Sequence, residues 1–111
     1  MIDWNRIIEL RNDVFGDDFG EVAEVFIEEM RETLDRLNTE ETHETLEADF
    51  HFLKSSALNF GFSELADICS AAEKAASGGD CPPINVVRVI AAFEASLAEF
   101  NSRAAEFGVA A

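Results

Sequence analysis

Apolar residues recur every three or four positions through five segments of the chain, and small polar residues, glycine or proline separate the segments. This spacing places the apolar side chains on one face of an α-helix. We therefore expect helices over about residues 3–14, 19–37, 40–60, 63–77 and 83–107. The first is short, and its stripe should be Trp4, Ile7, Leu10 and Val14.

The third segment has the most regular pattern, with apolar positions spaced four, three, four and three residues apart. These positions are Leu46, Phe50, Leu53, Ala57 and Phe60. Such heptad-like spacing is typical of the interior of a helical bundle. Since the joining segments are short, neighbouring helices should be antiparallel. The pattern predicts an all-α fold, an antiparallel four-helix bundle with a short N-terminal capping helix, as a single domain over residues 1–111.

Local signals predict where the helices begin and end. Asp17 or Asp18 can cap the second helix and Ser63 the fourth, because their side chains accept hydrogen bonds from free backbone N–H groups. Gly61 suits the position just after a helix, where a positive φ is often needed. The stretch Asp80-Cys81-Pro82-Pro83 lies where a proline can begin the last helix.

Charge and composition narrow the classes of function. The net charge is −15, and residues 1–50 hold sixteen acidic and four basic residues. Such a surface repels nucleic acid and anionic lipid, so neither is an expected partner. No apolar run reaches the roughly 20 residues that span a bilayer, and the N-terminus lacks the basic region of a secretory signal. Cys69 and Cys81 are too few for a disulfide scaffold, so we expect a cytoplasmic, reduced protein.

His51 is the main candidate for chemistry. It lies about 100° from Phe50 and about 160° from Leu53 around the third helix, outside the apolar stripe, so it should face solvent. Its helical neighbours one turn away are Glu47, Ala48, Lys54 and Ser55. Ala48 and Ser55 are small enough to leave room for a partner, and Lys54 supplies the positive charge that a phosphoryl group needs. Spacing alone leaves open whether His51 is a nucleophile or an ordinary surface residue.

The stretch from His51 to Gly61 resembles the signature of histidine-containing phosphotransfer (HPt) domains, His-x-Leu-Lys-Gly-small-small-x-x-(Leu or Phe)-Gly. The matching positions are His51, Leu53, Lys54, Ser56, Ala57, Phe60 and Gly61. Outside the signature, the residues similar to the family are Phe15-Gly16-Asp17, Phe26, Leu34, Leu65, Cys69 and Glu73. The likeness covers nearly the whole chain.

The resemblance implies a phosphocarrier with reversible histidine phosphorylation. His51 would accept the phosphoryl group from a phosphoaspartate of a receiver domain and pass it to another receiver, while Lys54 offsets the charge. Implied partners are response-regulator receiver domains, a hybrid histidine kinase, or both, bound by a monomeric carrier. Mg²⁺ is expected on the receiver and no cofactor in this chain. The expected docking residues are Ala48, Phe52, Ser55, Leu58 and Gly61.

Ser55 departs from the signature, which has glycine one turn after the histidine. A serine hydroxyl can hydrogen-bond a phosphoryl oxygen, or the side chain can crowd the site. Both alternatives stay open here, and they concern the efficiency of transfer.

Three other functions are compatible with parts of the sequence. Phe60-Gly61-Phe62 also suits the phosphotransfer domain of a chemotaxis-type kinase, but the chain has no ATP-binding domain, so a stand-alone carrier is expected if it is full length. Glu40, His43, Glu47 and His51 suggest half of a di-iron motif, but only two histidines exist and no metal site is expected. A non-catalytic interaction bundle would not need both His51 and Lys54.

Overall fold

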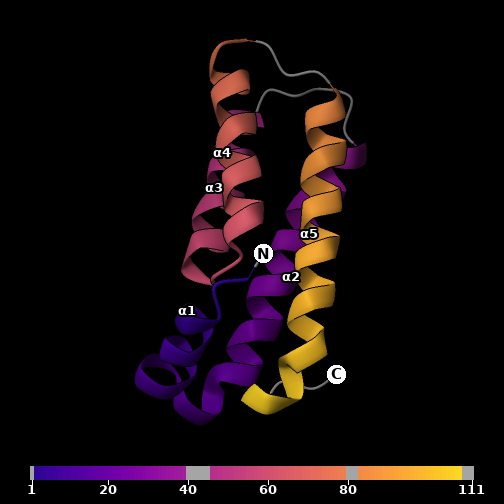
Figure 1. The fold of residues 1–111 in the computed structure, drawn as a ribbon. Helices are drawn as coiled ribbons and strands as arrows, with labels where there is room; N and C mark the ends of the chain where they lie inside the picture. Colours follow the sequence, from indigo (N-terminus) through magenta and orange to yellow (C-terminus); the bar gives the residue numbers. More distant parts are fainter. Residues whose placement is uncertain (1, 40–45, 80–82, 109–111) are drawn as a thin grey trace.

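The structure, a computed structural model, describes residues 2–39, 46–79 and 83–108. Helices α2 (Phe19–Thr39), α3 (Leu46–Asn59), α4 (Ser63–Ser77) and α5 (Pro83–Arg103) lie side by side and run in alternating directions (Figure 1). The short α1 (Trp4–Glu9) lies at one end of this bundle. The all-α prediction is confirmed. Among the described residues, no helix has both the length and the apolar character to cross a bilayer.

The predicted apolar stripes form the core. All five positions predicted for the third segment are buried, four of them on α3 and the fifth, Phe60, directly after it. On α2, the face opposite the core is exposed and acidic. Phe60 lies at the centre of an aromatic cluster, with its ring 5.3–5.6 Å from the rings of four other phenylalanines. These are Phe19, Phe26, Phe62 and Phe100. The Phe60 side chain, directly after α3, thus contacts α2, α5 and the neighbouring Phe62, through ring pairs that add to simple apolar burial.

The N-terminal helix differs from its predicted pattern. After Glu9 the backbone continues as a π-helical turn, Leu10–Val14. A π-turn adds a residue to the turn and moves the following side chains out of the 3.6-residue register. Val14, predicted to be in the stripe, is therefore 57% exposed, and Phe15 packs against the core in its place.

The predicted cap of the fourth helix, Ser63, is wrong. Helix α4 begins at Ser63 itself, and the residue before it, Phe62, makes no side-chain capping hydrogen bond. Phe62 holds this position because its ring is fully buried and its N–H donates to the Ala57 carbonyl at 2.8 Å. Asp17 and Asp18 lie in a 3-10 turn, Gly16–Asp18, directly before α2.

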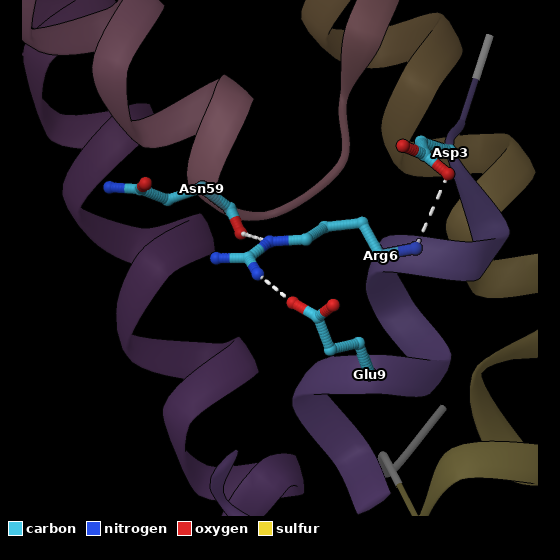
Figure 2. Close-up of polar contacts among 4 residues, drawn as sticks. All are labelled: Asp3, Arg6, Glu9 and Asn59. Atoms are coloured by element: carbon cyan, nitrogen blue, oxygen red, sulfur yellow. Dashed lines mark hydrogen bonds and ion pairs between the residues drawn. The ribbon is translucent and has the colours of Figure 1, made fainter. Parts of the chain in front are cut away.

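Helix α1 is attached to the turn between α3 and α4 by polar contacts (Figure 2). The Asp3 N–H donates to the Gly61 carbonyl at 2.7 Å, and Arg6 Nε donates to the Asn59 carbonyl at 3.0 Å. The Arg6 guanidinium also pairs with Glu9, and the Asp3 carboxylate accepts from the Arg6 N–H at 3.2 Å. Arg6 thus satisfies a carbonyl that the end of α3 leaves free.

An aromatic stack attaches the same helix to the C-terminal end of α5. The Trp4 ring lies nearly parallel to the rings of Phe100 and Phe107, at centroid distances of 6.3 and 5.7 Å. The Arg103 guanidinium carbon lies 4.4 Å from the Trp4 ring centroid, which is a cation–π geometry. Helix α1 therefore closes one end of the bundle, as the sequence predicted.

Gly61 has the positive φ that its position after α3 requires, 79°. A side chain there would also meet α1, because a Cβ built on Gly61 lies 2.9 Å from the Asp3 carbonyl oxygen. Gly79, which follows α4, has nearly the same φ of 80°, but no described atom lies within 4 Å of its added Cβ. An alanine at Gly79 would meet only the unfavourable backbone conformation, whereas an alanine at Gly61 would also meet α1. Comparing the two substitutions therefore separates these two contributions to the free energy of unfolding.

We predict that Gly61→Ala destabilises the fold more than Gly79→Ala. The positive φ alone should cost about 1–2 kcal/mol in both variants, and the close approach to Asp3 should add about 1 kcal/mol or more in Gly61→Ala. Urea unfolding followed by circular dichroism measures both free energies of unfolding. Equal losses in the two variants would contradict the proposed packing of α1 on Gly61.

Candidate functional site

His51 lies on the solvent face of α3, as its helical position predicted. Its side chain is 61% exposed, whereas Phe50 and Leu53 are fully buried. The core stripe therefore fixes the helix and holds the imidazole outward on a rigid element. Such support limits the movement of a reactive group.

Glu73, on α4, contacts both candidate residues of α3. Its Oε2 lies 2.6 Å from His51 Nδ1, and its Oε1 lies 2.7 Å from Lys54 Nζ. The Glu73 and Lys54 side chains are only 19% and 26% exposed, so the contact is partly shielded from water. One carboxylate thus uses each oxygen to hold a different side chain of the neighbouring helix.

This contact determines which imidazole nitrogen is available. An ionised carboxylate only accepts hydrogen bonds, so His51 Nδ1 must carry the proton that it donates to Glu73. In the neutral ring, the lone pair then lies on Nε2. The site offers Nε2 as a nucleophile without any further base.

Glu73 is an anion at neutral pH. The hydrogen bond from Lys54 lowers its pKa below the ordinary value of 4.5, with a smaller contribution from His51, against the opposing effect of burial. Because the pKa is depressed on folding, the contact stabilises the fold above the ordinary carboxyl pKa. This contribution is lost as the pH falls through the depressed value.

The sequence did not predict the role of Glu73, although Glu73 was among the residues similar to the HPt family. Its position one residue after the buried Ala72 shows that it flanks the apolar stripe of α4. That signal places a carboxylate beside α3. It does not say which α3 residues it meets, because the relative register of two helices depends on the turn between them.

The other predicted docking residues divide into two groups. Ala48 and Leu58 are exposed and Ser55 is half-buried on the His51 face, and Phe52 is 38% exposed one step around the helix. Gly61 was expected with them, but it is buried and hydrogen-bonded to Asp3, so it supports the turn and offers a partner no surface.

The other metal-ligating and thiol side chains that the structure describes show no reactive arrangement. Burial raises the pKa of the Cys69 thiol to about 12, and the nearby Glu73 charge adds to the effect, so the thiol stays protonated. Within residues 2–39, 46–79 and 83–108, no three His, Cys, Asp or Glu side chains gather in a way that could hold a metal ion. His43, Glu40 and Cys81 lie outside the described residues.

The comparison with protein families agrees with this geometry. The Hpt domain family matches residues 21–102, which include α3, α4 and most of α2 and α5. The chain belongs to the Hpt domain family. Membership indicates a histidine phosphotransfer role in a phosphorelay, which confirms the resemblance found in the sequence. No curated protein sequence and no solved structure matches this Hpt domain.

We predict that Glu73→Ala changes the tautomer of His51. In the wild type, Glu73 favours the ring protonated on Nδ1, and without the carboxylate the ring should shift towards protonation on Nε2. Long-range ¹⁵N NMR of the imidazole distinguishes the two forms. Asp67→Ala, an exposed acidic position on the same helix, is the control and should leave the His51 spectrum unchanged. An unchanged spectrum in Glu73→Ala would show that Glu73 does not set the tautomer.

Proposed function

We propose that this Hpt domain carries a phosphoryl group on Nε2 of His51 between receiver domains of a phosphorelay. The observation that supports this most is the contact of Glu73 with His51 Nδ1, since it leaves an exposed nucleophilic nitrogen on a rigid helix. The receiver domain that supplies the group is either free-standing or part of a hybrid kinase.

The transfer needs no external base. The Nε2 lone pair of neutral His51 attacks the phosphorus of a receiver phosphoaspartate as the bond to the aspartate oxygen breaks, and that carboxylate leaves with the electron pair. The ring keeps its Nδ1 proton and gains positive charge. Glu73 offsets this charge, because its carboxylate already accepts from Nδ1. The reverse steps, with a second receiver, release the group.

Lys54 has two electrostatic roles in this proposal. Its ammonium pairs with Glu73 at 2.7 Å, so it balances the carboxylate when the ring is neutral. An ammonium has three N–H donors, and those not used by Glu73 are available to the incoming phosphoryl oxygens. Mg²⁺ would be held by the acidic pocket of the receiver and not by this chain.

We predict that His51→Gln abolishes phosphorylation by a phosphorylated receiver domain and by phosphoramidate, a small phosphoryl donor. The exposed position of the ring means that the fold should be kept, with a change in unfolding free energy within about 0.5 kcal/mol. The measurement is acid-labile label after incubation with ³²P-labelled donor. His43→Gln, the substitution at the other histidine in the sequence, is the matched control and should label normally. Full labelling of His51→Gln would refute the assignment.

An apolar groove on α2 suits the docking of such a receiver. The groove has a volume of about 430 Å³ and is lined by Glu21, Val22, Val25, Phe26 and Glu29. Val25 is 55% exposed there, so its side chain is accessible to a partner. The flanking glutamates favour a partner with apolar side chains beside basic ones.

The groove lies within reach of a partner bound at His51. Phe26 packs against Phe60, which directly follows α3 and comes nine residues after His51, roughly 13 Å along the helix axis at 1.5 Å per residue. A typical interface of about 800 Å² per partner is wide enough to cover both. The exposed Phe52 side chain adds apolar surface on the α3 side.

We predict that Val25→Glu slows phosphoryl transfer from a receiver about fivefold or more, since it places a charge in an apolar contact. Val87→Glu is the control, because Val87 is 61% exposed on α5 and outside the groove, and the variant has the same net charge. Rapid-quench kinetics measures both rates. Labelling by phosphoramidate, which needs no docking, should be unchanged in both variants. Equal receiver rates for the two variants would exclude the groove from the interface.

A further inference from the structure

Ser55 places a hydroxyl one turn after His51 on the same face of α3. Ser55 is half-buried one turn after His51, and its hydroxyl has no hydrogen-bond partner among the residues that the structure describes. A hydroxyl inside a helix commonly donates to the carbonyl four residues back. Thr33 does so on α2, with Oγ1 3.1 Å from the Glu29 carbonyl oxygen. Ser55 keeps its donor free on the face that carries His51.

Helical geometry places the Ser55 side chain next to that of His51. Residues four apart are neighbours on a helix, with Cβ atoms about 5–6 Å apart. Each Cα–Cβ bond also tilts towards the N-terminus of the helix. The Ser55 side chain therefore leans back towards His51, and the His51 ring is exposed above it.

The other neighbours of His51 differ from Ser55 in what they offer a phosphoryl group. Such a group carries close to two negative charges and three acceptor oxygens. Glu47 can only accept hydrogen bonds, and Ala48 has no polar side-chain atom. Lys54 can donate, but Glu73 already holds it at 2.7 Å. Among these four neighbours one turn away, Ser55 is the donor that has no competing partner.

We propose that Ser55 is a phosphoryl-binding residue, whose O–H donates to an oxygen of the phosphoryl group on His51 Nε2. The inference rests on the proposed function, since it requires phosphohistidine at position 51. No covalent bond to Ser55 forms or breaks. The hydrogen bond stabilises the phosphorylated domain and has no counterpart in the unphosphorylated one, so it moves the equilibrium of transfer towards this domain and away from the receiver.

A purely steric role for Ser55 makes a different prediction. A side chain that only crowds the approach of the receiver slows transfer in both directions by the same factor. The equilibrium distribution of phosphate between the two free proteins depends only on their own free energies. It is therefore unaffected by crowding in the complex, and a change in the equilibrium constant identifies an interaction with the phosphoryl group.

The experiment compares the equilibrium constant of transfer for the full 111-residue chain and three variants. The variants are Ser55→Ala, Ser55→Gly and Ser55→Thr, and the probe is a purified, ³²P-phosphorylated receiver domain that transfers to the wild type. We expect Ser55→Ala and Ser55→Gly to shift the equilibrium roughly threefold to tenfold towards the receiver, the effect of one lost hydrogen bond. Ser55→Thr keeps a hydroxyl, so its equilibrium constant of transfer should equal that of the wild type.

An unchanged equilibrium constant in Ser55→Ala would overturn the inference, even if Ser55→Gly changes the rates. A shift in Ser55→Ala that Ser55→Thr does not reverse would also overturn it, since the effect would not come from the hydroxyl. The proposed function fails in a distinct way, with no label on the wild type from either phosphoramidate or any receiver. Circular dichroism and thermal unfolding confirm that each variant is folded.

Discussion

The register between α3 and α4 is the constraint on which the site depends. Gly61 and Phe62 form the turn that joins these helices, and Phe62 is held there by its buried ring and its hydrogen bond to Ala57. His51 lies ten residues before Gly61 and Glu73 twelve residues after it, so each is roughly 15–18 Å from the turn. A different turn would move the carboxylate along α4 and separate it from His51 and Lys54. The buried turn between α3 and α4 therefore determines which carboxylate meets the exposed imidazole of His51.

Periodicity alone predicted much of the fold and the direction of His51. The stripe predicted for the third segment is buried at every position, and an outward His51 follows from the same 3.6-residue repeat. The partner of His51 could not be predicted in this way, since Glu73 belongs to another helix and its register is a tertiary property. The π-turn at Leu10–Val14 was missed for a related reason, because an added residue in a turn leaves no clear mark in the pattern. Gly61 was assigned to the docking surface from its motif position, which does not reveal that α1 covers it.

Charge is distributed so that the site differs from the rest of the surface. The acidic residues of α2 face solvent on the side away from the core, where water screens their mutual repulsion. At the site, one carboxylate meets one ammonium and one imidazole, all of them on the two helices that pack most closely. A second contact between helices, Arg36 with Asp49, joins α2 to α3 close to the same level. The phosphoryl group would thus enter a locally balanced region of a strongly acidic protein.

The aromatic stack of α1 gives the protein an intrinsic fluorescent probe of how α1 packs on the bundle. Trp4 is the single tryptophan, and the chain has no tyrosine, so ultraviolet emission comes almost entirely from one ring. That ring is partly buried and contacts Phe100, Phe107 and Arg103 at the end of the bundle where α1 is attached. Its fluorescence will report whether α1 is packed on the bundle and will be nearly insensitive to phosphorylation of His51. Separation of α1 from the bundle can therefore be followed optically in the same sample in which phosphate on the histidine is measured by radioactivity.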